Sequence, residues 1–89
     1  MEKENVAKII FETLSEILEN PPPSISANET FDELEINSIV FIRLVVSSEN
    51  QFGISFEDDM LLLSKYETIQ EFIDYVEKRI ITNLNNEVS

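Results

Sequence analysis

The sequence predicts an all-α domain of four helices, three longer and one short. Only one glycine and three prolines occur among the 89 residues, so few positions interrupt a helix. Apolar residues recur at steps of three and four in three separate segments, which is the period of an amphipathic helix. The prolines stand together at residues 21–23 and the glycine at residue 53, so they mark the breaks between helices.

The first helix is expected over residues 5–19. Its charged residues lie on one side, and its other side is apolar, formed by Val6, Ile10, Leu14, Ile17 and Leu18. The helix is expected to end before Asn20, because a proline lacks an N–H group and disfavours helical geometry in the residue before it.

A loop over residues 20–37 follows, which is longer than most connections inside a compact domain. Such a loop needs side chains that fix it to the core. Phe31 and Leu34 are the apolar residues best placed for this, within a short turn of helix begun by Asn28 or Thr30.

The second helix, over residues 38–52, has two separate apolar faces. One face is expected to join the core and comprises Phe41, Leu44, Val45 and Phe52. The other comprises Ile39, Ile42 and Val46 and is interpreted as a partly exposed contact surface, because a small domain rarely buries both. The alternative is that these three residues are ordinary buried residues.

Gly53 is expected to end this helix in a left-handed conformation, with Ile54 and Phe56 turned inward. A short third helix is expected over residues 57–63, with Ser55 as its N-cap. Residues 68–71 form a capping-box sequence that opens the last helix, whose apolar face comprises Ile69, Phe72, Ile73, Val76 and Ile80. The domain is expected to span residues 1–82, followed by a disordered tail over residues 83–89.

Composition narrows the classes of function. The formal net charge of -12 repels phosphate backbones and anionic lipid, so neither nucleic acid nor a membrane is an expected partner. Cysteine and histidine are absent, so a protein thiol nucleophile, an imidazole base and a zinc site are excluded. The acids at residues 57–59 fit the start of a helix better than a calcium loop. We expect a cytoplasmic, monomeric protein with no metal and no catalytic residues.

One segment carries a specific signal. It runs Phe-Asp-Glu-Leu-Glu-Ile-Asn-Ser-Ile over residues 31–39 and leads into an apolar helix that ends with Phe52-Gly53-Ile54. Together with the long first loop and the threonine-capped last helix, it resembles the acyl and peptidyl carrier protein family, from about Val6 to Ile81. The resemblance implies a four-helix carrier fold in which Ser38 is esterified by 4'-phosphopantetheine from coenzyme A, and the thiol of this arm carries cargo as a thioester.

The chemistry at Ser38 is consistent with this role. A serine at a helix N-terminus places its phosphodiester beside unpaired N–H groups and the positive end of the helix dipole. The alternative is that Ser38 merely caps the helix, as serine at such positions usually does.

The sequence departs from the family pattern at four positions. Asn37 stands where aspartate is common, which keeps the capping oxygen but loses a charge, and Glu35 replaces a common glycine, which makes the approach to the helix stiffer. Val40 and Arg43 stand where acidic residues usually face partner enzymes. We therefore expect the contact with partners to depend on apolar groups and to include Asn37, Ile39, Val40, Ile42, Arg43 and Val46.

The resemblance thus predicts a non-catalytic carrier of acyl, aminoacyl or peptidyl thioesters. The substitutions on the second helix favour a specialised pathway, such as nonribosomal peptide or polyketide assembly, over fatty-acid synthesis. The implied partners are a phosphopantetheinyl transferase, a loading ligase or adenylation enzyme, and downstream acyl- or peptidyl-transfer enzymes. The alternatives are a carrier for fatty-acid synthesis or D-alanine transfer and, from another class, an acidic helical interaction module that is never modified.

Overall fold

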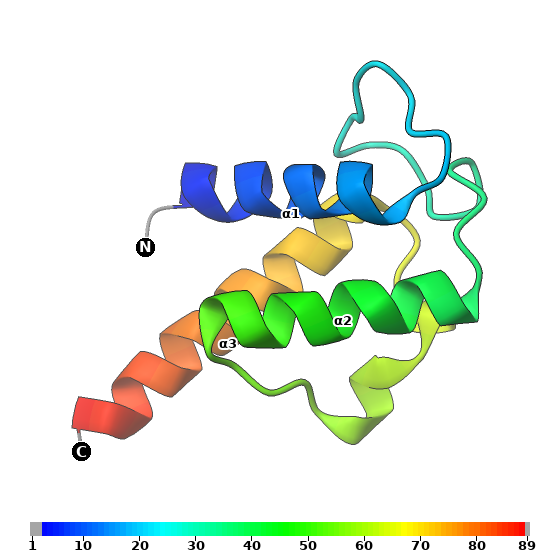
Figure 1. The fold of residues 1–89 in the computed structure, drawn as a ribbon. Coiled ribbons are helices and arrows are strands. Elements are labelled where there is room, and N and C mark those ends of the chain that lie inside the picture. Colours follow the sequence, from blue (N-terminus) through cyan, green and yellow to red (C-terminus); the bar gives the residue numbers. More distant parts are fainter. Residues whose placement is uncertain (1–2, 89) are drawn as a thin grey trace.

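Three α-helices make up most of the protein. The computed structural model describes the backbone of residues 3–88 and the side chains of residues 5–83. Helix α1 spans Lys3–Ile17, α2 spans Ser38–Phe52 and α3 spans Ile69–Val88, with two short 3-10 helices, η1 (Asp58–Leu61) and η2 (Leu63–Lys65), between α2 and α3. Figure 1 shows α1 and α2 running in opposite directions, with α3 crossing behind them. The predicted all-α fold is confirmed.

The core lies between the three helices and is rich in aromatic rings. Its buried residues come from every helix and from both long connections: Val6, Ile10, Leu14, Phe31, Ile36, Phe41, Leu44, Val45, Ile54, Phe56, Tyr66, Ile69, Phe72, Ile73, Tyr75 and Val76. Phe72 of α3 packs against Phe31, Phe41, Phe56 and Tyr66, with ring centroids 5.4–6.1 Å apart. Within the described chain, no helix is both long and apolar enough to cross a membrane.

The helix boundaries agree with the sequence pattern most closely at α2. That helix spans the predicted residues 38–52, and Gly53 ends it with a φ of 65°. Helix α1 is shifted toward the N-terminus relative to the predicted 5–19 and ends at Ile17. Helix α3 continues to Val88, beyond the predicted end at about residue 82, so this helix is longer than expected. The division into a domain over residues 1–82 and a tail over residues 83–89 stays a prediction, and Ser89 lies outside the described residues.

A turn that begins at Thr30 holds the loop over residues 20–37. Thr30 is one of the two residues at which the sequence predicted such a turn to begin. Thr30 N–H donates to Glu33 Oε1 (2.9 Å), and Glu33 N–H donates to Thr30 Oγ1 (3.0 Å), which is a complete capping box. Phe31 is buried and Leu34 is half-buried, so both predicted anchors pack on the core.

The same loop also supplies acceptors for the start of α3. The N–H groups of Ile69 and Gln70 donate to the carbonyl oxygens of Glu29 and Ala27, each at 2.9 Å. Thr68 Oγ1 accepts from Glu71 N–H (3.3 Å), as the capping-box sequence predicted, while Glu71 Oε1 accepts from Glu67 N–H (3.1 Å). The N–H groups at the start of α3 therefore find acceptors both in the loop and in side chains next to the helix.

The predicted third α-helix over residues 57–63 is wrong in type and in its cap. The chain forms η1 and η2 instead, interrupted by extended backbone at Leu62, and Glu57 rather than Ser55 stands at the N-cap of η1. The regular geometry breaks at Leu62, whose backbone is extended (φ -102°, ψ 127°). The hydroxyl of the buried Tyr66 donates to the Met60 carbonyl oxygen at 2.9 Å, which fixes the end of η1 to the core. The Ser55 carbonyl accepts from Arg79 Nε (3.0 Å), which fixes this segment to α3.

Candidate functional site

Ser38 is the first residue of α2, and its side chain is exposed. The residue before it, Asn37, is the N-cap: its Oδ1 accepts from Val40 N–H at 2.9 Å, and its backbone oxygen accepts from Phe41 N–H at 2.9 Å. The capping oxygen predicted for Asn37 is thus confirmed. The alternative that Ser38 is itself the cap is wrong, because its neighbour performs that function.

The surroundings of the Ser38 hydroxyl suit a phosphate. Its oxygen has no hydrogen bond to any residue whose side chain is described, and the first turn of α2 contains no acidic residue. A phosphodiester on this oxygen would lie at the positive end of the α2 dipole, beside N–H groups that the helix itself leaves unpaired. The residues present therefore fit a phosphate-linked group attached at Ser38.

The approach to Ser38 depends on a left-handed residue. Glu35 has a φ of 56° and, among residues 3–88, is the one residue other than glycine with a positive φ. Its N–H donates to Asp32 O (3.0 Å), and the next N–H, of Ile36, donates to Phe31 O (3.0 Å). The turn buries Ile36 and leaves Asn37 and Ser38 in solvent. Glycine usually occupies left-handed positions, because other residues are strained there. The backbone at Glu35, where the sequence predicted a stiffer approach to the helix, is therefore strained.

The second apolar face of α2 is exposed, as predicted from its separation from the core face. The exposed fractions are 69% for Ile39, 42% for Ile42 and 48% for Val46, so the alternative that they are ordinary buried residues is wrong. Phe41, Leu44 and Val45 on the opposite face are buried, and Phe52 is half-buried against the core.

The other residues expected to contact partners differ in their exposure to solvent. Arg43 and Asn37 are exposed, whereas Val40 is half-buried and packs against the core. Val40 was expected at the contact surface because it stands where acidic residues usually face partner enzymes, but in this helix its side chain is turned partly toward the core.

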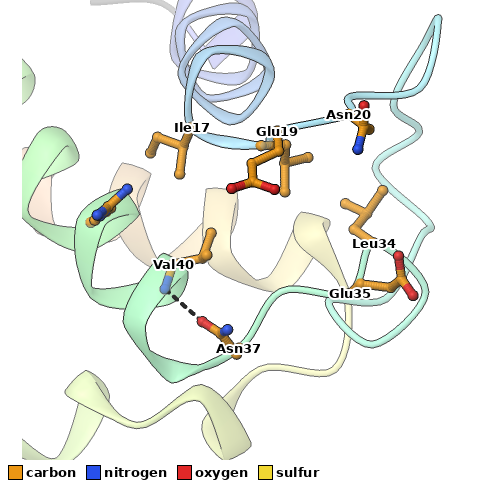
Figure 2. A pocket seen from close by; sticks show the side chains of 9 residues that line it. Ile17, Glu19, Asn20, Leu34, Glu35, Asn37 and Val40 are labelled. Atoms are coloured by element: carbon orange, nitrogen blue, oxygen red, sulfur yellow. Dashed lines mark hydrogen bonds between the residues drawn. The ribbon is translucent and has the colours of Figure 1, made fainter.

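A cavity of about 320 Å³ lies beside Asn37, between the end of α1, the loop and the start of α2 (Figure 2). Its apolar lining comes from Ile17, Leu18, Leu34 and Val40, and its polar lining from Glu19, Asn20, Glu35, Asn37 and Arg43. No periodic pattern in the sequence indicated this cavity, because it forms where the loop returns past α1.

A second cavity of about 390 Å³ lies where the turn at residues 30–36 meets the η2 segment. Phe31, Ile36, Leu63 and Tyr66 give it an apolar lining, and Thr30, Asp32, Ser64 and Glu67 complete it. Tyr66 was not foreseen as a core residue. Burial raises the pKa of its phenol, with further contributions from Tyr75 and the negative charge of Asp59.

Comparisons with known proteins identify what the chain resembles. The family model described as a phosphopantetheine attachment site matches residues 8–76. The acyl carrier protein of Thermobifida fusca is 29% identical over 76 residues, which cover 80% of this chain and 94% of that protein. The acyl carrier protein of Acidothermus cellulolyticus is 25% identical over 77 residues, which cover 85% of this chain and 89% of that protein.

A solved structure gives the same result for the fold. The crystal structure of an acyl carrier protein from Thermotoga maritima superposes with a TM-score of 0.77 at 29% sequence identity. The match covers 92% of this chain and 94% of the Thermotoga chain, so the likeness extends over most of the fold.

Proposed function

Because the chain belongs to the phosphopantetheine attachment site family, we propose that Ser38 is the residue that bears its covalent 4'-phosphopantetheine group. The protein is an acyl carrier protein of this family. The observation that best supports Ser38 as the attachment site is that its hydroxyl is exposed at the N-terminus of α2, while Asn37 supplies the cap. The hydroxyl therefore does not have to leave a structural hydrogen bond in order to react.

In the proposed modification, Ser38 Oγ loses its proton and forms a bond to the phosphorus of coenzyme A that bears the pantetheine. The bond from that phosphorus to the second phosphate breaks, and adenosine 3',5'-bisphosphate leaves. The chain's own contribution is to present the hydroxyl in solvent and to place helix N–H groups beside the new negative charge. The attached arm supplies a thiol, which this cysteine-free chain lacks, to hold cargo as a thioester.

The protein would then be a substrate of other enzymes and would catalyse nothing itself. A covalent arm keeps the reactive cargo at high effective concentration for successive enzymes. The partners we propose are a phosphopantetheinyl transferase, a loading ligase or adenylation enzyme, and a downstream acyl- or peptidyl-transfer enzyme.

We further propose that the pathway is a specialised one, such as nonribosomal peptide or polyketide assembly. The support is the exposed face of α2, which has Ile39, Ile42 and Arg43 in place of an acidic surface. A carrier for fatty-acid synthesis is the second candidate, since two of its relatives are named only as acyl carrier proteins. Offering the modified protein to an adenylation enzyme and to a fatty-acyl ligase separates the two candidates by which one loads it.

Intact mass spectrometry after incubation with coenzyme A, magnesium and a broad-specificity phosphopantetheinyl transferase tests the attachment site. We expect the wild type to gain the mass of one phosphopantetheine group and Ser38→Ala to gain none. Ser64→Ala, which removes another exposed hydroxyl, is the matched control and should be modified like the wild type. A wild type that stays unmodified, or a Ser38→Ala protein that is modified, would contradict the proposal.

A further inference from the structure

We propose that the connection between α2 and α3 consists of a fixed strap and a movable flap, and that the flap opens over the second cavity while the strap stays in place. We call residues 53–57 the strap and residues 58–65, which contain η1 and η2, the flap. In Figure 1 the connection runs below α2, from the end of this helix back toward its start. This division is a property of the unmodified chain and does not depend on a group attached at Ser38.

The last turns of α3 hold the strap by its backbone. Arg79 Nε donates to the carbonyl oxygen of Ser55 at 3.0 Å, and Asn83 Nδ2 donates to that of Gly53 at 3.3 Å. The two α3 side chains are four positions apart, so they lie on one side of the helix. Both residues lie beyond residues 8–76, which match the family model, so that model does not account for this contact.

The peptide group between Ser55 and Phe56 is bonded at both ends to charged side chains. Its carbonyl oxygen accepts from Arg79 of α3, and its N–H group donates to Glu49 Oε2 of α2 at 2.9 Å. Both charged side chains are half-buried. Hydrogen bonds to charged groups are stronger than neutral ones, and each of these two polarises the peptide group in favour of the other. We call this arrangement the peptide clamp, because it fixes the strap between α2 and α3.

The flap, in contrast, has few contacts that hold it. None of residues 58–65 is buried. Among the described residues, one side chain from outside the flap bonds to it, the Tyr66 hydroxyl, which donates to Met60 O at 2.9 Å. The N–H group of Glu57, immediately before the flap, donates to the Tyr75 hydroxyl at 3.0 Å. We therefore expect the flap to open between Glu57 and Tyr66 while the strap stays packed.

The flap supplies one wall of the second cavity. Leu63 and Ser64 line the cavity from the flap, and Phe31 and Ile36 line it from the loop that leads to α2. Opening of the flap would expose this apolar lining, while the peptide clamp keeps Ile54 in the core. The flap thus controls the access of solvent and of small apolar molecules to this cavity.

Amide hydrogen exchange followed by NMR tests the division of the connection. The N–H groups of Ile54 and Phe56 in the strap donate to the carbonyl oxygen and the carboxylate of Glu49. Those of Met60 and Lys65 in the flap take part only in turns within the connection. We expect protection factors at least about tenfold higher in the strap than in the flap. Equal protection in the two parts would overturn the division.

The peptide clamp is tested with Glu49→Leu and Arg79→Met, which each remove one partner of the peptide group. Each should lower the protection factor of the Phe56 amide about tenfold, as expected for a lost hydrogen bond to a charged group. The Met60 amide should keep its protection, because opening of the flap leaves the clamp intact. The double variant should show less than the product of the two changes, since both act on one peptide group.

Lys78→Met is the matched control for Arg79→Met, because it removes the same charge from an exposed neighbouring residue. It should leave the Phe56 amide unchanged. An equal fall at Phe56 and Met60 in Arg79→Met would show that strap and flap open as one unit. No change at Phe56 in Glu49→Leu and Arg79→Met would contradict the clamp.

Access to the cavity is measured with a single introduced thiol, which this cysteine-free chain allows. Ile36→Cys places the thiol in the second cavity, and Ile10→Cys, the matched control, places it in the core on α1. Below the unfolding transition, alkylation of Ile36→Cys by iodoacetamide should be faster and nearly independent of urea, because opening of the flap exposes little surface. Alkylation of Ile10→Cys should rise steeply with urea. The same steep dependence for both thiols would show that the cavity opens only on global unfolding, and would overturn the flap.

Discussion

Two residues with left-handed backbone lie on either side of α2, and only one of them is glycine. Gly53 ends the helix with a φ of 65°, and no atom lies close to the position that a Cβ would take there. Glu35 has a φ of 56° before the helix begins. Because a side chain in this conformation approaches its own backbone, Glu35 carries a strain that Gly53 avoids.

Replacing Glu35 with glycine should therefore stabilise the fold. The left-handed conformation costs a non-glycine residue roughly 1–2 kcal/mol, and glycine loses roughly 0.5–1 kcal/mol through the greater freedom of its unfolded chain. We expect Glu35→Gly to raise the free energy of unfolding in urea by about 0.5–1 kcal/mol. Asp32→Gly, at an exposed position with negative φ in the same turn, is the control and should lower it. The strain argument fails if both variants lower the stability equally.

At the scale of elements, the segment between α2 and α3 is defined by side-chain hydrogen bonds instead of helical periodicity. The Tyr66 hydroxyl donates to Met60 O, and the Tyr75 hydroxyl accepts from Glu57 N–H at 3.0 Å. Both phenols keep their protons at neutral pH, and burial raises the pKa of each. The position of η1 and η2 on the core thus depends on two tyrosine hydroxyls, and the bond that Tyr66 donates requires a protonated phenol.

This dependence predicts a loss of stability at alkaline pH. Tyrosine ionises near pH 10 in an unfolded chain, whereas the buried Tyr66 resists ionisation, so its contribution is complete below about pH 10 and declines as the pH rises above it. Urea midpoints measured from about pH 8 to about pH 11 should fall for the wild type. They should fall less for Tyr66→Phe, which keeps Tyr75. At neutral pH, Tyr66→Phe should cost about 1 kcal/mol for the lost hydrogen bond. Equal alkaline losses in both proteins would show that Tyr66 is not responsible.

For the whole molecule, the dominant electrostatic feature is the excess of 18 acidic over 6 basic residues. The charges are carried mainly by exposed side chains around an apolar core, so folding concentrates like charges on a small surface. Salt screens such repulsion over distances of about 10 Å at 0.1 M.

We therefore expect sodium chloride to stabilise the protein. The urea midpoint should rise between about 0.01 M and 0.5 M salt, because the Debye length shortens across this range. A variant with Glu16 and Glu19 both changed to glutamine carries less negative charge at exposed positions and should show a smaller rise. A midpoint that is independent of salt in both proteins would argue against repulsion as a significant term.

The parts of this molecule that sequence predicted are those in which one periodicity dominates. Helix α2 was predicted at its full length, and its two apolar faces were separated correctly, because Phe41 and Ile42 point in different directions on a helix. The η1 and η2 segment could not be predicted, since its geometry depends on a bond between Tyr66 and Met60 that no local preference encodes. The cavity beside Asn37 likewise combines residues far apart in the chain, from Ile17 to Arg43. Ser38 was singled out by the pattern around it, and its role in attachment stays a prediction.

The first N–H groups of α3 donate to the carbonyl oxygens of Ala27 and Glu29, so the long loop helps to hold the start of the last helix. Cleavage of this loop by a protease should therefore affect α3 as well as the loop. A break near residue 28 would release two acceptors from the N-terminus of α3 and would loosen Phe31, which touches the rings of Phe41 and Phe72. Loop and helix should accordingly gain or lose amide protection together in hydrogen exchange.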